Sequence, residues 1–153
     1  VRDCFCSEMG PQLQHRLQEH FNHHSVSFFL GDTHWKRWKH WRDRHYRMSD
    51  RNKAALFLLT AYEDIWRRVI WKFDSSGFDF QSVRLSGIQP ELYSVYQAAK
   101  AISIGSRNIT TADLASPELV TDEAFQLIIC ALLLAKYGDA ILHFERKEGE
   151  ETQ

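Results

Sequence analysis

The chain has 153 residues, of which 44% are apolar and 25% charged, so its composition excludes a disordered segment and allows a substantial buried core. The net charge is only −1, but residues 1–76 carry 13 Lys and Arg against 9 Asp and Glu, whereas residues 77–153 carry 6 against 11. The length indicates one globular domain, and the charge separation suits a protein that presents one charged face to a partner.

The three cysteines, Cys4, Cys6 and Cys130, are too few for a disulfide framework and indicate a reducing compartment. Cys130 lies in the apolar run FQLIICALLLA at 125–135, where we expect it to pack as a small hydrophobic side chain. That run is too short to span a bilayer. The sequence also lacks the basic region and following apolar core that would predict a secretory signal.

The first predicted helix begins near Pro11, because proline suits a first helical turn and apolar residues then recur at helical spacing over 13–21. The next segment, VSFFLGD at 26–32, fits either a short strand or the start of another helix. Residues 34–47, HWKRWKHWRDRHYR, predict an amphipathic helix. Its tryptophans recur every third residue and share one broad side, while charged residues cover the other.

A long helix with a continuous apolar side is predicted from the N-cap Ser49 to about Phe73. The segment FDFQSVRLSG at 78–87 is predicted to be a loop or a short extended piece. Pro90 begins the next helix, which reaches about Ile104. Three residues that suit helix N-caps come after it: Thr111, Ser116 and Thr121.

The last strong helix is predicted over 122–137, and Gly138 is placed to end it. The sequence contains no run of alternating strand residues, glycine-rich phosphate loop or internal repeat. We therefore expect an all-α fold, with a single compact domain of six or seven helices over residues 1–144 and a charged tail at 145–153. The helices at 53–72 and 122–137 should be the most buried.

Cys4, Cys6, His20 and His23 are weak candidates for a zinc site. Their side chains are suitable ligands, but Cys4 and Cys6 have one residue between them where zinc fingers usually have two to four. A solvent-exposed, histidine-rich turn after a helix is the favoured interpretation of the histidines. We therefore predict no metal and no cofactor.

An enzyme is not expected either. A reactive cysteine needs an electropositive, partly exposed setting, whereas the neighbours of Cys130 in sequence are apolar. The carboxylates are scattered, and no pair stands out at helical spacing within an apolar face.

The segment 34–47 allows several interpretations. Cations interleaved with tryptophan resemble a surface that stacks bases and contacts phosphates, and a basic amphipathic helix also suits a membrane surface or an acidic protein. The ordinary alternative is a helix whose tryptophans face the core and whose cations face water. We predict a partner-binding face that consists of Trp35, Lys36, Arg37, Trp38, Lys39, Trp41, Arg42, Arg44, Tyr46 and Arg47.

A second aromatic and basic cluster, WRRVIW, occupies residues 66–71. Five tryptophans and five tyrosines are too many for a chain of this size to bury completely, so some should be exposed. We predict that Trp66 packs inside.

The stretch from Gly77 to Ile104 resembles the core of the nonstructural protein NSs of phleboviruses and related phenuiviruses. In that family a basic helix precedes a glycine, a short loop, Leu-x-Gly and a helix with the pattern V-x-Q-A-A-K. The matching residues here are Gly77, Leu85, Gly87, Val95, Gln97, Ala98, Ala99 and Lys100. HSVSFFLGD at 24–32 gives a fainter similarity. The family's Trp-Pro-x-Gly turn and its acidic, aromatic-ending C-terminal motif are not present in this sequence.

The resemblance implies an all-helical, non-enzymatic protein that antagonises the host interferon response. Such proteins bind and sequester or block host proteins of innate signalling, transcription or translation control, in the cytoplasm or the nucleus, and some self-associate. A nucleic-acid-binding helical module is one alternative. A helical regulator of the Bcl-2 type, with an apolar groove for a partner helix, is another.

Overall fold

The computed structural model describes residues 10–23, 28–74, 76–106 and 109–142. Within them the chain forms the all-α fold that the sequence predicts. The α-helices are α1 (Pro11–His23), α2 (Asp32–Arg44), α3 (Asp50–Leu59), α4 (Glu63–Val69), α5 (Pro90–Ile104), α6 (Thr111–Ala115) and α7 (Asp122–Tyr137). Two 3-10 turns, η1 (Ile70–Lys72) and η2 (Phe80–Ser82), flank a short antiparallel hairpin of β1 (Phe73–Asp74) and β2 (Gly77–Phe78).

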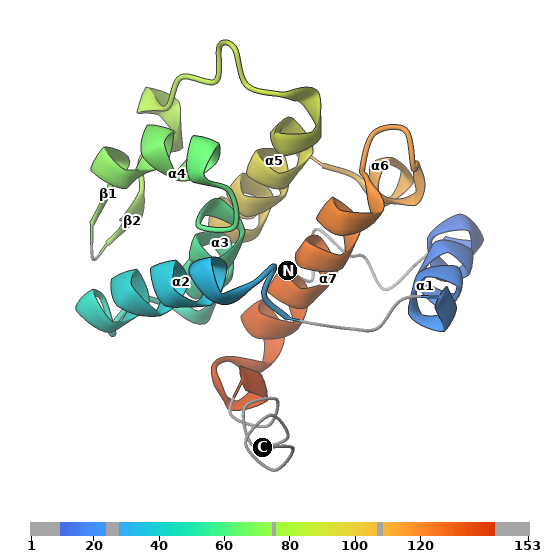
Figure 1. Ribbon diagram of the computed structural model, residues 1–153, viewed down its shortest axis with the longest axis horizontal. Coiled ribbons are helices and arrows are strands. Elements are labelled where there is room, and N and C mark those ends of the chain that lie inside the picture. The colour runs from blue at the N-terminus through green and yellow to red at the C-terminus, as the bar shows by residue number, and fades with distance from the viewer. Residues whose placement is uncertain (1–9, 24–27, 75, 107–108, 143–153) are drawn as a thin grey trace.

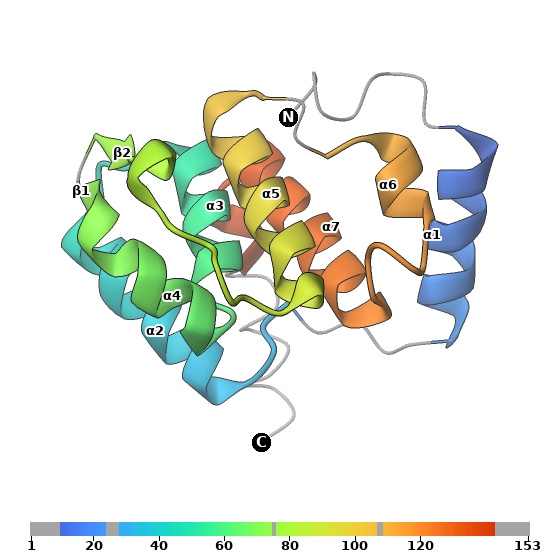
Figure 2. The ribbon, with the colours of Figure 1, turned by 90° about the horizontal axis from the view of Figure 1, so that it is seen from above.

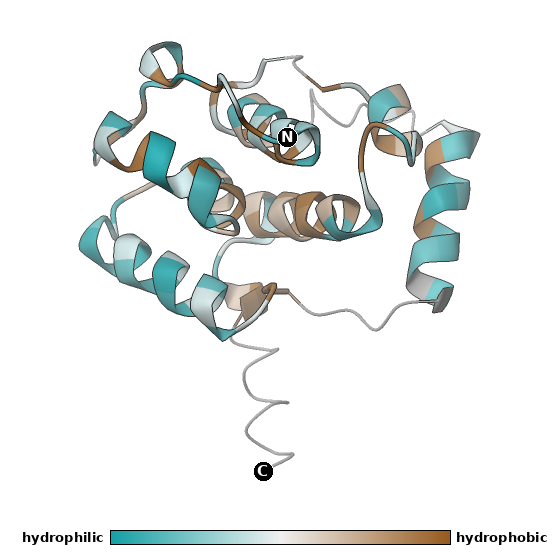
Figure 3. Ribbon diagram, turned by 45° about the horizontal axis from the view of Figure 1, so that its top comes forward, coloured by the Kyte–Doolittle hydropathy of each residue, from teal (hydrophilic) through white to brown (hydrophobic). Residues whose placement is uncertain are grey.

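Helices α3, α5 and α7 form the centre of the molecule (Figure 1). Helices α2 and α4 and the hairpin lie at one end, whereas α6 and α1 lie at the other, as the view from above also shows (Figure 2). Every side chain of α3 from Ala54 to Leu59 is buried, because its neighbours cover it on all sides. Hydrophobic residues are concentrated on α7, whereas α2 is mainly hydrophilic (Figure 3).

The prediction of one helix from Ser49 to Phe73 is wrong, because the chain breaks after Leu59. The Thr60 hydroxyl donates a 2.7 Å hydrogen bond back to the Leu56 carbonyl. The Arg37 guanidinium donates to the Thr60 carbonyl at 2.8 Å, which takes the acceptor that a continuing helix would use. The chain then becomes extended, and α4 begins with two acidic residues that suit a first helical turn.

Two of the predicted N-caps are confirmed. The Ser49 hydroxyl accepts a hydrogen bond from the Asn52 amide, and the Thr121 hydroxyl accepts one from the Ala124 amide, both at 3.2 Å. These bonds satisfy amides that have no partner within the helix. Gly138 ends α7 with φ of 72°, a left-handed conformation that favours glycine.

The connection between α5 and α7 differs from the prediction. Thr110, and not Thr111, caps α6, and Asp113 completes a capping box with it. Ser116 ends α6 and does not begin another helix. The reason is tertiary, since the Val120 amide bonds the Ser116 carbonyl at 3.0 Å and the buried Val120 side chain fixes this turn against the core.

Candidate interaction surface

The predicted binding segment forms α2 and the turn after it, and its central tryptophan belongs to the core. Trp38 is 0% exposed, and its indole nitrogen donates to the Lys53 carbonyl at 3.1 Å. The Arg42 guanidinium lies 4.8 Å from the centre of the Trp38 ring. Trp38 therefore joins α2 to α3 and offers no surface to a partner.

Trp35 and Trp41 are half-buried and pack in aromatic clusters at either end of α2. The Trp35 ring lies edge-on to Phe29, with ring centres 5.0 Å apart. The Trp41 ring contacts the buried Trp66 at 5.5 Å and Phe73 at 5.8 Å. The prediction that Trp66 packs inside is thus confirmed.

Most cations of α2 already have partners within the fold. Arg37 donates to the Thr60 carbonyl, and Arg42 forms a 2.9 Å ion pair with Asp139. Lys36 pairs with Asp32 at 2.8 Å and Lys39 with Asp43 at 3.6 Å. The last two pairs are exposed and add little stability. The three ion pairs nevertheless reduce the positive charge that α2 offers to a ligand.

The end of α2 lies beside β1 (Figures 1 and 2), and exposed basic and aromatic residues occur at the end of α2 and just before β1. We call this surface the cationic aromatic end, which consists of Arg44, Tyr46, Arg47, Trp71 and Lys72. Trp71 is 85% exposed and Tyr46 68% exposed. The two segments are held together by the His45 ring, which lies 4.7 Å from that of Phe73.

A hollow of about 420 Å³ lies beside the hairpin, and Trp71 and Lys72 contribute to its lining. An incoming side chain could therefore contact Trp71 from this hollow. Trp71 lies outside the predicted binding face, although it belongs to the second aromatic and basic cluster at 66–71. Helical spacing indicates the exposure of Trp71. Trp66 and Val69 share the buried face of the helix, and Trp71 lies off that face.

The metal candidates are not brought together in the described part of the chain. Cys4, Cys6 and the side chain of His23 lie outside it. The His20 Nε2 atom lies 3.0 Å from the Gln126 Oε1 atom, and its ring packs on Phe125. Over residues 10–23, 28–74, 76–106 and 109–142, no group of three or more His, Cys, Asp or Glu could hold a metal ion.

Cys130 is buried among apolar side chains, as predicted. Among the helices in the described ranges, none has the length and apolar character needed to cross a membrane.

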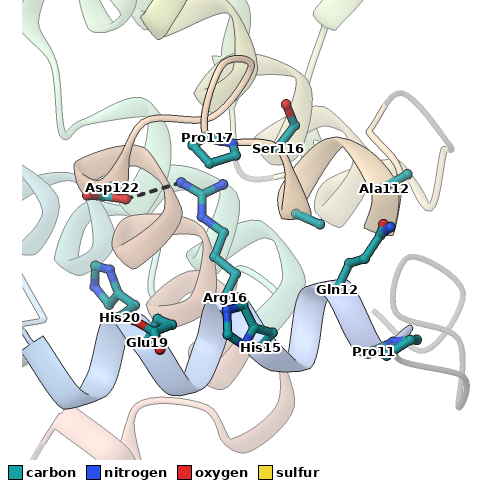
Figure 4. Close-up of a pocket in the computed structure, with 11 residues that line it drawn as sticks. Pro11, Gln12, His15, Arg16, Glu19, His20, Ala112, Ser116, Pro117 and Asp122 are labelled. Atoms are coloured by element: carbon teal, nitrogen blue, oxygen red, sulfur yellow. Dashed lines mark hydrogen bonds and ion pairs between the residues drawn. The ribbon is translucent and has the colours of Figure 1, made fainter.

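A second hollow, of about 730 Å³, lies between α1 and the α6–α7 connection (Figure 4). Arg16 extends across it and is almost fully buried. Its guanidinium donates to the carbonyls of Leu114 and Val120, at 2.7 and 2.5 Å, and lies 3.3 Å from Asp122. It also sits 4.4 Å from the centre of the Phe125 ring. Arg16 therefore attaches α1 to the rest of the domain.

Replacing Arg16 with methionine should lower the free energy of unfolding by about 2–3 kcal/mol, because it removes charge-assisted hydrogen bonds from two buried carbonyls. Urea denaturation measures this loss, and amide exchange should become faster in α1. The control is Arg67→Met, since Arg67 is exposed and its ion pair is with Asp64, three residues earlier. Equal effects of the two variants would contradict the attachment role.

Comparison of the chain with known proteins matched no family model, no curated protein and no solved structure. The molecule itself establishes an all-α domain with an exposed tryptophan, tyrosine and arginine surface at one end.

Proposed function

We propose that this domain is the protein-binding part of a viral interferon antagonist, and that the cationic aromatic end contacts a host protein of innate signalling, transcription or translation control. The observation that carries the proposal is Trp71, which is 85% exposed just before β1, while the exposed Tyr46 and two arginines lie at the end of α2, which packs against β1 through His45 and Phe73. Tryptophan, tyrosine and arginine are the residues that most often dominate binding energies at protein interfaces. The resemblance of residues 77–104 to phenuivirus NSs supplies the class of host process.

A nucleic-acid-binding module would use the cations of α2 together with the cationic aromatic end, but the ion pairs of α2 favour a protein partner. Lys36 and Lys39 are each neutralised by a carboxylate one turn away, and Arg42 by Asp139. Phosphate binding would require these cations, and it would weaken linearly with salt on logarithmic axes. We expect no measurable binding of RNA or DNA at low salt in a filter assay. Binding with such a salt dependence would favour the alternative.

An interferon-promoter reporter in stimulated host cells tests the proposed function. The wild-type chain should lower the reporter signal, and the double variant Tyr46→Ala/Trp71→Ala should restore it, because the two largest exposed contacts of the surface are gone. The matched control is Tyr137→Ala/Leu30→Ala, which removes two exposed apolar side chains elsewhere.

Both double variants should melt at the temperature of the wild type, since the deleted side chains are exposed. The proposal fails if the wild type has no effect on the reporter. It also fails if the two double variants behave alike.

A further inference from the structure

An apolar groove of about 780 Å³ lies between the start of α5 and the α6–α7 connection. Two large side chains at its edges are exposed to solvent, Leu119 by 58% and Tyr93 by 49%. Other apolar residues that line the groove are Leu85, Ile88, Ile109 and Val120. This volume is in the range of pockets that receive a ligand or a few anchoring side chains of a protein.

The polar groups of the groove are acidic. Its described lining residues include Glu91, Asp113 and Glu118, and they include no Lys or Arg. The carboxylates of Glu91 and Glu118 belong to exposed residues, whereas Asp113 accepts a hydrogen bond from the Thr110 amide. Gln97 also lines the groove, and its buried Oε1 has no hydrogen-bond partner among the described residues. The groove therefore offers acceptors and negative charge around an apolar floor.

The groove is held open by the fold itself. Leu119 sits in a turn whose next residue, Val120, is anchored in the core and bonded through its carbonyl to Arg16. Thr121 caps α7 on the other side of that turn. The opposite wall is the first turn of α5, which Pro90 begins. A preformed apolar site loses less conformational freedom on binding than one that must first become ordered.

We propose that this acidic groove binds a cationic amphipathic helix of a partner protein. One or two large apolar side chains of that helix enter between Tyr93 and Leu119, and flanking Lys or Arg side chains pair with Glu91 and Glu118. Helices that bind in apolar grooves present anchors at i, i+3 or i+4, and i+7. The charge of the groove selects a basic helix over an acidic one. This proposal concerns different residues from the cationic aromatic end and does not depend on it.

Two synthetic helical peptides test the proposal with the full chain. One carries leucines at i, i+3 and i+7 with lysines elsewhere, and the other has glutamates in place of the lysines. We expect the lysine peptide to shift the amide resonances of residues 91–97 and 118–121 on titration. The glutamate peptide should bind at least tenfold more weakly, and added salt should reduce this difference.

Substitutions of residues that line the groove test whether the peptide binds there. Leu119→Ala should weaken binding of the lysine peptide about tenfold, as expected for an anchoring contact. Glu118→Lys should weaken the lysine peptide and strengthen the glutamate peptide. The matched control is Tyr137→Ala, which removes an equally exposed side chain outside the groove. Tyr46→Ala/Trp71→Ala should bind the lysine peptide as the wild type does, which separates this test from that of the proposed function.

The proposal is overturned if millimolar lysine peptide causes no shifts, if the shifts map to other residues, or if both peptides bind equally. It is also overturned if the groove resonances shift with protein concentration alone, since the occupant would then be a second copy of the chain.

Discussion

Trp38→Ala should lower the free energy of unfolding by about 3–5 kcal/mol, the usual cost of deleting a large aromatic side chain from a core. Trp38 is fully buried, and its indole nitrogen has a partner in the Lys53 carbonyl. The substitution leaves a cavity between α2 and α3 and removes the indole hydrogen bond to that carbonyl. Urea denaturation followed by circular dichroism measures the loss.

The matched control is Trp71→Ala, which deletes the same side chain from an exposed position. Its free energy of unfolding should stay within about 0.5 kcal/mol of the wild type. Similar losses in the two variants would show that Trp71 is packed and that the cationic aromatic end is not a free surface. Trp38→Ala is therefore expected to destabilise the fold, so a loss of partner binding in this variant would not identify an interface.

The second large effect is a loss of stability in acid caused by His34. His34 is buried, its Nε2 atom lies 2.7 Å from the Phe57 carbonyl, and its Nδ1 atom accepts a hydrogen bond from the Leu30 amide at 3.1 Å. These bonds require a neutral ring with its proton on Nε2. Burial is the main cause that lowers the pKa of His34 from its ordinary value of 6.5 to about 4, and the nearby charge of Arg37 adds to it.

The direction of the pH effect follows from proton binding. Between pH 6.5 and 4 the unfolded chain binds a proton at His34 and the folded chain does not, so acid favours unfolding. The free energy of unfolding keeps its full value above about pH 6.5 with respect to His34, and it decreases as the pH falls toward 4. Between pH 7.5 and pH 4.5 this loss in the free energy of unfolding amounts to about 2–3 kcal/mol.

Urea denaturation at these two pH values, with wild type and His34→Gln, isolates this contribution. The wild type should lose about 2–3 kcal/mol more than the variant on acidification, whatever the stability of the variant at pH 7.5. His40→Gln serves as the control and should behave as the wild type, because His40 is exposed. If wild type and His34→Gln lose stability in parallel, His34 is not the group responsible.

Local features of the fold were predictable from the sequence, whereas tertiary ones were not. Ser49 and Thr121 cap their helices because the cap depends on residues two or three positions away. The break at Thr60 could not be foreseen, since it involves a hydrogen bond from Arg37, which is 23 residues earlier. Ser116 likewise has the chemistry of a cap, but the burial of Val120 determines the path of the chain there.

In the candidate site, too, local features were predictable from the sequence and tertiary contacts were not. The spacing of the three tryptophans in α2 correctly places them on one side of the helix. It does not predict how deeply each is buried, and of the three only Trp38 is completely buried. Arg42 is withdrawn from the surface by Asp139, which is 97 residues later in the chain. Trp71 lies off the face of α4 that buries Trp66 and Val69, as helical spacing indicates, but the chain also changes from α4 to the 3-10 turn η1 just before it. A helical pattern cannot predict that change.

Photochemical cross-linking tests the central proposal most directly. The photoreactive residue p-benzoylphenylalanine replaces Trp71 in one variant and Tyr137 in another, and both are expressed in host cells. The proposal predicts a discrete cross-linked host protein from position 71, which disappears when Tyr46→Ala is added, and no such product from position 137. No cross-link from position 71, or the same product from both positions, would contradict it.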